Sequence, residues 1–389
     1  MQSTTPHSEP RDRGQRGQII VIAALAMIAI IGGVSLILEG GNAYAHQRVV
    51  QNAADSVANA GAATIGQRLG GGGQVDADVL SAMTAMATAN KLDSFTGYYT
   101  DVKGNMLTPL GVITTDRATA ERVGPADGGD TTIPPLTQGV TVGGSQTFPT
   151  TFARAIGLSQ FTASADATAR AGPLTGGLFM PVVFPVSLAN CDGSGNVVVV
   201  DEPWRMSNPD PTNNEAHPIG QEYIVPLCKT GGGSFAVLDL DPTKTCEEEV
   251  TSPSAIQFID FPIDVASDNG NDCAKKINDA VTANTMHGDV VLIPICDGDC
   301  VTTGGSHATY HIIRIAAFFL DYMADKNGGN DPACAYTTSP SYGTSLVNVT
   351  GGNGSSSCMV GWFVRWVTSG PVGTGTINNG EAVGVQLIR

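Results

Sequence analysis

Residues 19–38 read IIVIAALAMIAIIGGVSLIL, and none of these 20 residues carries a formal charge. Twenty helical residues extend about 30 Å, which matches the hydrocarbon core of a bilayer. In lipid, an isolated segment satisfies its backbone hydrogen bonds only as a helix. The stretch from Ile19 to Leu38 therefore predicts a transmembrane helix rather than a buried helix of a soluble domain.

The charges that flank this segment predict its orientation. Arg11, Arg13 and Arg16 precede it, and Glu39 follows it directly. Because positively charged flanks stay in the cytoplasm, we expect residues 1–17 to form a cytoplasmic tail. The predicted localisation is the cell membrane, crossed once, with the bulk of the chain extracytoplasmic.

A cleaved signal peptide is the alternative that the sequence leaves open. Ala43-Tyr44-Ala45 resembles the small-residue site at which signal peptides are cut. Against this reading, the apolar core is much longer than the usual apolar region of about 7–15 residues, and the site lies inside a helical pattern. Under either reading, the bulk of the chain is exported.

Composition and charge restrict the class of protein. The chain has 389 residues, of which 14% are charged and 48 are glycine, and its net charge is −16. The first 38 residues contain three arginines and two acidic residues, so the acidity belongs to the exported part. An acidic exported surface argues against nucleic acid or anionic lipid as a partner, because both would be repelled.

The cysteines are confined to the second half of the chain, which predicts disulfide bonds in an oxidising compartment. Their number allows 105 pairings, so the connectivity stays open. Their distribution also indicates a domain boundary between about residues 169 and 178. The eight cysteines are Cys191, Cys228, Cys246, Cys273, Cys296, Cys300, Cys334 and Cys358.

A second helical pattern covers residues 43–69. Val50, Ala54, Val57, Gly61 and Ile65 recur at spacings of three or four and form one face of small and apolar side chains. Such a helix is stable only when it packs on a partner. We therefore expect this face to be an interaction surface, and a second copy of the chain is one candidate partner.

Local patterns further along the chain predict an α+β fold. Gly40 and Gly41 favour a break or kink between the transmembrane helix and the helix over 43–69. A second helix is expected over 75–91, a short one over 150–156 and another over 272–284. Alternating or continuous apolar runs predict strands at 97–102, 107–114, 140–142, 161–171, 177–188, 197–200, 222–227, 235–240, 290–295, 310–320, 359–367 and 382–388.

These elements suggest four regions. Residues 1–17 form the tail, 18–38 the transmembrane helix, 39–172 a small α+β domain with the Ala-rich helix, and 173–389 a Cys-rich β domain. The strands at 359–367 and 382–388 are expected to close the sheet of that last domain.

No group of residues predicts catalysis, a cofactor or a metal. Cys296, Cys300, His307 and His311 have the order of a zinc site, but the middle spacing is short and the compartment favours a Cys296–Cys300 disulfide. His311 alone is interpreted as a hydrogen-bonded histidine in a sheet. The chain lacks H-E-x-x-H, a P-loop and a dinucleotide-binding glycine motif, so we expect a non-enzymatic protein.

The N-terminal part resembles the TadG-like proteins of tight-adherence (Flp) pilus assembly. The resemblance lies in RGQ at 16–18, GNAY at 41–44, QNAAD at 51–55 and AGA at 60–62. It implies a membrane-anchored accessory protein of the pilus or cell envelope, whose exported part binds other proteins. A processed pseudopilin would carry Glu at the fifth position after Gly17, where this chain has Ile22.

Two rival functions remain. A surface adhesin or sugar-binding module predicts an exposed cluster of Trp204, Trp362 or Trp366. An exported hydrolase predicts one cleft that gathers His217 or His307 with acidic residues.

Overall fold

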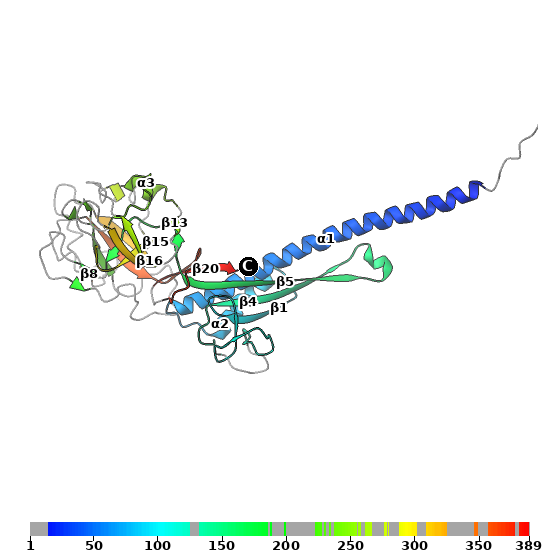
Figure 1. Cartoon of the computed structure of the whole chain (residues 1–389), viewed down its shortest axis with the longest axis horizontal. Coiled ribbons are helices and arrows are strands. Elements are labelled where there is room, and N and C mark those ends of the chain that lie inside the picture. Colours follow the sequence, from blue (N-terminus) through cyan, green and yellow to red (C-terminus); the bar gives the residue numbers. More distant parts are fainter. Residues whose placement is uncertain are drawn as a thin grey trace, which may run out of the picture.

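The computed structural model combines one long helix, two sheets and short connecting elements (Figure 1). The residues that it describes are 15–124, 132–185, 187–188, 198–199, 222–227, 229–230, 233–234, 237–254, 256–257, 261–266, 276–277, 279, 288–301, 309–324, 346–348, 357–377 and 381–388.

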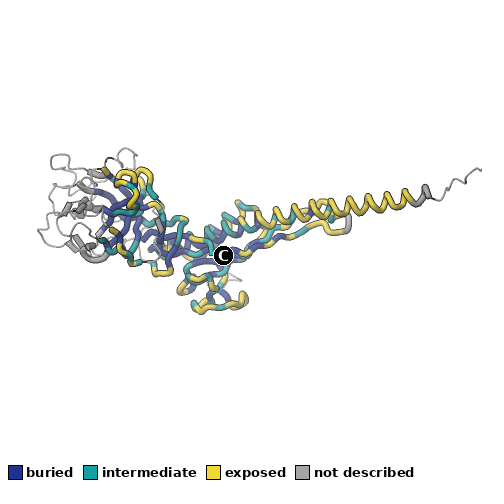
Figure 2. The backbone as a smooth tube through the Cα atoms, turned by 45° about the horizontal axis from the view of Figure 1, so that its top comes forward, coloured by how far each residue is buried: buried dark blue, intermediate teal, exposed yellow. Residues whose placement is uncertain are grey.

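Helix α1 (Gln15–Leu69) is a single element of 55 residues, and the rise per residue makes it about 80 Å long. Its first half projects away from the rest of the chain, and its second half lies on a sheet (Figures 1 and 2). The exposed half contains the apolar residues 19–38, and the half on the sheet contains the small-residue pattern. The change from large aliphatic to small side chains along α1 therefore coincides with the change from exposed to buried surroundings.

The expected break at Gly40 and Gly41 is wrong, because α1 continues through both residues. A helical glycine costs only about 1 kcal/mol relative to alanine, and both flanking segments favour helix. Glu39 is also tied to a neighbouring hairpin, as described below. Two glycines do not outweigh these constraints.

The first sheet carries α1 and α2 (Asp76–Ala89) on one face. Its strand order is β19-β20-β5-β4-β1-β2-β3. The long central pair is the antiparallel hairpin of β4 and β5, whose turn contains a short 3-10 helix, η1. The bounds of these elements are β1 Ser94–Thr100, β2 Met106–Leu107, β3 Ile113–Thr114, β4 Gly139–Pro149, η1 Ala153–Ile156, β5 Gln160–Pro173, β19 Trp366–Ser369 and β20 Ala382–Ile388.

Small side chains let α1 lie close to this sheet. Alternate residues of β5, from Ala163 to Ala171, are buried alanines on the face toward α1. On α1, a Cβ at Gly61 would lie 2.8 Å from Cγ2 of Val140 and 3.0 Å from Sδ of Met83. The glycine at this position is therefore required by close packing of helix on sheet.

Polar side chains of α1 complete one edge of the hairpin. Strand β5 pairs with β20 only from Thr168 onward, so no described strand neighbours its earlier residues on that side. The amide of Gln47 donates to the carbonyl oxygen of Ser164 at 2.8 Å, and that of Gln51 donates to the carbonyl oxygen of Asp166 at 3.2 Å. The helix therefore binds the strand that the sheet leaves open.

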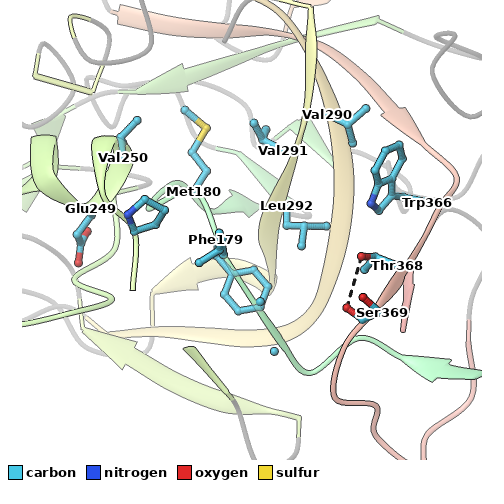
Figure 3. Close-up of a pocket in the computed structure, with 14 residues that line it drawn as sticks. Phe179, Met180, Glu249, Val250, Val290, Val291, Leu292, Trp366, Thr368 and Ser369 are labelled. Atoms are coloured by element: carbon cyan, nitrogen blue, oxygen red, sulfur yellow. Dashed lines mark hydrogen bonds between the residues drawn. The ribbon is translucent and has the colours of Figure 1, made fainter. Parts of the chain in front are cut away.

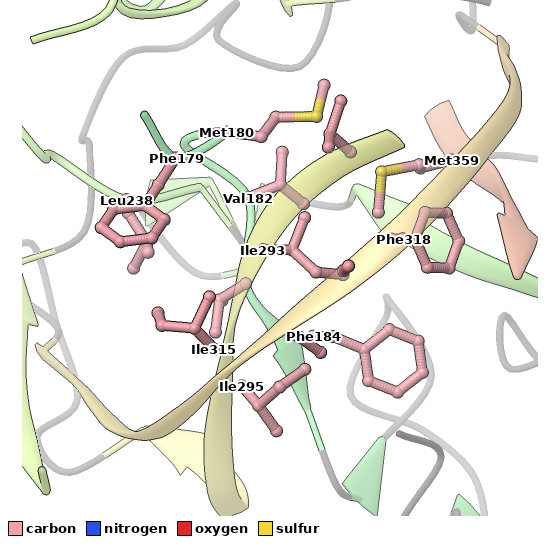
Figure 4. Packing of buried hydrophobic residues seen from close by; sticks show 14 of the residues in the cluster. Phe179, Met180, Val182, Phe184, Leu238, Ile293, Ile295, Ile315, Phe318 and Met359 are labelled. Carbon is pink, nitrogen blue, oxygen red and sulfur yellow. The ribbon is translucent and has the colours of Figure 1, made fainter. Parts of the chain in front are cut away.

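The second sheet has the strand order β17-β10-β18-β16-β15-β7, and β14 also pairs with β16. Its aromatic and branched aliphatic side chains form a separate core (Figure 4). Phe363 contacts Phe184 and Phe318 edge to face, with ring centroids 4.9 Å and 5.2 Å apart. The bounds are β7 Phe184–Pro185, β10 Glu222–Leu227, β14 Ile263–Ala266, β15 Asp289–Val301, β16 Thr309–Ala324, β17 Leu346–Asn348 and β18 Ser357–Val364. We call this sheet and its core the second lobe. We call the first sheet, together with α1 and α2, the first lobe.

Short elements border the second lobe. Helix α3 spans Cys246–Thr251 and begins with a capping box between Thr245 and Glu248. Three strand pairs complete the described elements: β6 Gly176–Gly177 with β13 Ile256–Gln257, β8 Ser187–Leu188 with β9 Val198–Val199, and β11 Lys229–Thr230 with β12 Gly233–Ser234.

The expected place of the last strand is wrong. Strand β20 pairs with β5 in the first sheet instead of closing the second. The chain leaves the first lobe after Pro173 and returns to it at Trp366, where β19 begins. A short apolar strand carries no local signal of which sheet it joins, because either sheet buries it equally well. The domain limits at 172 and 173 stay a prediction.

Most other expectations agree with the structure. A long apolar helix followed by a β-rich α+β chain is confirmed, as are the helix over 75–91 and the strands at 290–295 and 310–320. The expected helix over 272–284 falls largely outside the described residues.

The cysteines are only partly described. Cys246 and Cys296 are 5% and 0% exposed in the core of the second lobe, and no described cysteine is a free thiol. The side chains of Cys191, Cys228, Cys273, Cys300, Cys334 and Cys358 lie outside the described part. Their pairing stays a prediction.

Candidate functional site

The first candidate surface is the bare apolar half of α1, residues 19–38. Every side chain in it is exposed except that of Ser35, which is half-buried. Exposure ranges from 51% at Val34 to 76% at Leu36 among the large hydrophobic residues. Within the described part of the chain, this helix alone is long and apolar enough to cross a membrane. The hydroxyl of Ser35 donates to the carbonyl oxygen of Ile31 at 2.6 Å, so the main polar side chain here is satisfied within the helix.

A carboxylate marks the end of the apolar segment. Glu39 is only 8% exposed, and its oxygens accept hydrogen bonds from two backbone amides of the β4–β5 turn. The Thr151 amide lies 3.1 Å from Oε1, and the Phe152 amide lies 3.0 Å from Oε2. Hydrogen bonds to a charged acceptor are stronger than neutral ones. Glu39 therefore fixes the turn of the hairpin to the first helical residue beyond the apolar segment.

The sequence does contain an unusual residue at this junction, but local patterns do not predict what it contacts. Glu39 is the one acidic residue between Asp12 and Asp55. An isolated carboxylate in so apolar a region suggests a specific partner, but its partner is 112 residues away in sequence.

The predicted interaction face of α1 is occupied within the chain. Val50, Ala54, Val57 and Ile65 are all 0% exposed, and Gly61 abuts β4 and α2. The helix thus finds its packing partner in its own sheet. Self-association through this face stays a prediction without support, since the described packing already covers it.

A buried hydrogen bond joins α2 to β1. The hydroxyl of Tyr99 donates to Oδ1 of Asp76 at 2.6 Å, and the Gly124 amide donates to the same oxygen at 2.9 Å. Burial, and then the adjacent Asp76 carboxyl, raise the pKa of the Tyr99 phenol well above its usual range. Tyr99 is therefore a neutral donor at physiological pH.

An ion pair connects the two lobes. Nε of Arg314 in β16 lies 2.7 Å from Oε1 of Glu381, which is 1% exposed and directly precedes β20. Glu381 also forms an antiparallel bridge with Ala316. Beside this pair lies a cavity of about 440 Å³, lined by residues of both lobes such as Pro173 of β5 and His311 of β16.

The second cavity at the junction measures about 470 Å³ and is mainly apolar (Figure 3). Phe179, Met180 and Trp366 line it together with residues of β15. The ionisable side chain in the described lining of this cavity is that of Glu249. Its Oε1 accepts a hydrogen bond from the backbone amide of Asp241 at 2.6 Å. The described lining contains no histidine, cysteine or lysine, and its polar side chains are those of Glu249, Thr368 and Ser369.

The residues of the rejected zinc site have separate surroundings. Nδ1 of His311 lies 2.8 Å from Oδ1 of Asp264, its cross-strand neighbour, as expected for a histidine within a sheet. Cys296 is buried in the second core, and the side chains of Cys300 and His307 lie outside the described part. Among described residues, no group of three His, Cys, Asp or Glu side chains could hold a metal ion.

The tryptophans do not form an exposed cluster where they are described. Trp362 is 2% exposed in the second core, and Trp366 is half-buried beside the apolar cavity. Trp204 and His217, which the rival functions require, lie outside the described residues.

Residues 17–64 match the Tad family model, described as "Putative Flp pilus-assembly TadE/G-like". The matched range lies within α1 and includes both its apolar and its buried half. The resemblance in this segment is confirmed, and the segment is TadE/G-like. No curated protein and no solved structure matches the chain.

Proposed function

We propose that this chain is a membrane-anchored accessory protein of Flp (Tad) pilus assembly or of the cell envelope, which acts by binding other proteins. Residues 19–38 anchor it, the tail with Arg11, Arg13 and Arg16 stays in the cytoplasm, and both lobes lie outside. The protein is not an enzyme under this proposal. Disulfides among its cysteines stabilise the second lobe in an oxidising compartment.

One observation carries the proposal: the TadE/G-like segment coincides with a single helix that has two different surroundings. Its first half exposes a continuous apolar surface, which is unfavourable in water and favourable in lipid. Its second half is buried on the chain's own sheet. A rigid helix of this kind supports an arrangement in which a folded body is held at the membrane.

The anchor is tested by charges at the centre of the apolar segment. Ala26→Arg combined with Ala29→Arg costs about 5–7 kcal/mol of insertion free energy, because each central Arg costs about 2.5–3.5 kcal/mol. We expect this variant to leave the membrane fraction after a carbonate wash. The matched control replaces the same two alanines by leucine and should remain in the membrane. Retention of the arginine variant would contradict the anchor.

The pilus function is tested in the organism that carries the chain. Deletion of the gene should reduce the number of Flp pili per cell, and the wild-type chain should restore it. The double arginine variant should fail to restore it even when its level in the cell equals that of the wild type. Normal piliation in the deletion strain would contradict a role in pilus assembly and leave the envelope as the remaining site of action.

Topology and disulfides are tested by chemical labelling of intact cells. A membrane-impermeant amine reagent should label lysines of the first lobe from outside, such as Lys91 and Lys103. Maleimide should modify no cysteine of the exported part until a reductant is added. Labelling of cysteines without reductant would contradict the proposed disulfides, while protection of the lysines would contradict the orientation.

A further inference from the structure

The turn of the β4–β5 hairpin presents apolar side chains at the end of the apolar segment. We define the hairpin tip as residues 150–159, between β4 and β5. Phe152 is 40% exposed and Leu158 is 49% exposed, although both are large hydrophobic residues. Large hydrophobic side chains are also exposed elsewhere in the first lobe, as at Leu110 (84%), so the argument depends on where these two lie relative to the apolar segment.

The position of the tip along α1 is fixed by the structure. Strands β4 and β5 run beside α1 toward its apolar half, so that their turn lies beyond the body of the sheet (Figures 1 and 2). The Phe152 amide is bound to Oε2 of Glu39 at 3.0 Å, and Glu39 directly follows Leu38. Since α1 is continuous through Gly40 and Gly41, no break separates the tip from the end of the apolar segment.

Aromatic packing holds the base of the tip rigidly against α1. The imidazole of His46 stacks on the ring of Phe148, with centroids 3.9 Å apart and planes 5° from parallel. Phe148 in turn contacts Phe161 across the hairpin at 6.2 Å. The hairpin therefore cannot swing away from α1 without losing both this stack and the hydrogen bonds to Glu39.

Charge also distinguishes the tip from the rest of the exported part. Residues 150–159 contain Arg154 and no acidic residue, whereas the chain as a whole carries −16. The acidity that would repel a membrane surface is therefore missing here. Segments that lie in the bilayer interface combine basic side chains with Phe or Leu, and the tip contains both kinds.

We propose that the hairpin tip is a second membrane contact, with Phe152 and Leu158 seated in the bilayer interface on the exported side. The interface begins where the hydrocarbon core ends, and the apolar segment places that boundary at Leu38 and Glu39. This inference rests on the proposed anchor, because the level of the bilayer follows from residues 19–38. The contact fixes how the lobes are oriented above the membrane, since α1 alone would leave rotation about its axis free.

The test uses the full chain in vesicles of phosphatidylcholine whose acyl chains are brominated near the headgroup. Phe152→Trp and Leu158→Trp each place a fluorophore in the tip, and the emission of the unmodified chain is subtracted. We expect the added emission to be blue-shifted and largely lost in brominated vesicles relative to unbrominated ones. The control is Leu110→Trp, because Leu110 is 84% exposed in the β2–β3 turn, at the edge of the first sheet and separated from the β4–β5 hairpin by β1. Its added emission should remain unchanged.

The outcomes separate this inference from the proposed anchor. Vesicles are washed with carbonate before measurement, and retention of the chain reports the anchor independently of the tip. A retained chain whose two tip tryptophans are unquenched would overturn the membrane contact and leave the anchor standing. Such a result would assign the tip to solvent or to a protein partner. A chain that the wash removes would overturn the anchor and the tip contact together.

Discussion

At Gly61, α1 packs closely against the first sheet, and replacement of this glycine tests that packing. In Gly61→Ala, the new Cβ would lie 2.8 Å from Cγ2 of Val140 and 3.0 Å from Sδ of Met83. Carbon atoms prefer separations of about 3.5–4.0 Å, so both neighbours must move by several tenths of an ångström or more. Overpacking of this kind costs about 1–3 kcal/mol.

Gly40→Ala is the matched control for this variant. Both positions are helical glycines of α1, so both gain about 1 kcal/mol of helix propensity on replacement by alanine. A Cβ at Gly40 meets nothing within 4 Å. The difference between the two variants therefore isolates the packing term, and Gly61→Ala should be the less stable by about 1–3 kcal/mol.

Hydrogen exchange of the full chain in detergent measures this difference. Amides of β4 and β5 report the free energy of opening the first lobe. Their protection should be about 5–150 times lower in Gly61→Ala than in Gly40→Ala, since about 1.4 kcal/mol corresponds to a factor of ten. Equal protection in the two variants, or greater protection in Gly61→Ala, would refute the described packing of α1 on Val140 and Met83.

Three further predictions concern buried polar contacts. The Tyr99 phenol stays protonated in the folded protein above pH 10 but ionises near pH 10 when unfolded, so the folded state binds more protons there. The free energy of unfolding should fall by about 1.4 kcal/mol per pH unit above pH 10, and Tyr99→Phe should show a smaller fall in alkaline denaturation. Arg314→Ala should destabilise the chain by about 3 kcal/mol or less, because Arg314 is 30% exposed and its replacement removes the 2.7 Å contact with the buried carboxylate of Glu381. Tryptophan-detected melting measures this loss, and Arg314→Lys should recover part of it. Glu39→Ala should cost the hairpin turn about 1.5–3 kcal/mol in hydrogen bonds, seen as faster exchange of its amides, while Glu39→Gln should lose less. Unchanged melting or exchange in the two alanine variants would contradict these assignments.

Local sequence patterns were sufficient for the elements whose surroundings are uniform along their length. The burial of Val50, Ala54, Val57 and Ile65 follows from their helical spacing, and the structure confirms that they share a buried face. Strands β15 and β16 were also predictable, because continuous apolar runs of their length are buried on both faces. In each case one short window of sequence contains all the information that decides the structure.

The break expected at Gly40 and Gly41 failed because a window of sequence does not include tertiary contacts. Each glycine weakens a helix by about 1 kcal/mol. The hydrogen bonds of Glu39 to the turn and the stack of His46 on Phe148 oppose such a break from a segment more than 100 residues away in sequence. The same limit explains why the return of β20 to the first sheet was missed.

The two halves of α1 are one continuous helix, but their side chains suit different surroundings. In residues 19–38 large aliphatic side chains form a continuous exposed apolar surface, while in the half on the sheet small side chains allow a close approach to β4 and β5. A flexible joint between the halves would let the lobes move relative to the apolar segment, and the glycines at 40 and 41 would permit one. The contacts of Glu39 and His46 lie within six residues of those glycines and hold the hairpin against the helix on both sides of them. Tertiary contacts therefore stabilise α1 near Gly40 and Gly41, where its helix propensity is lowest. They make the helix a rigid connection between the apolar segment and the lobes.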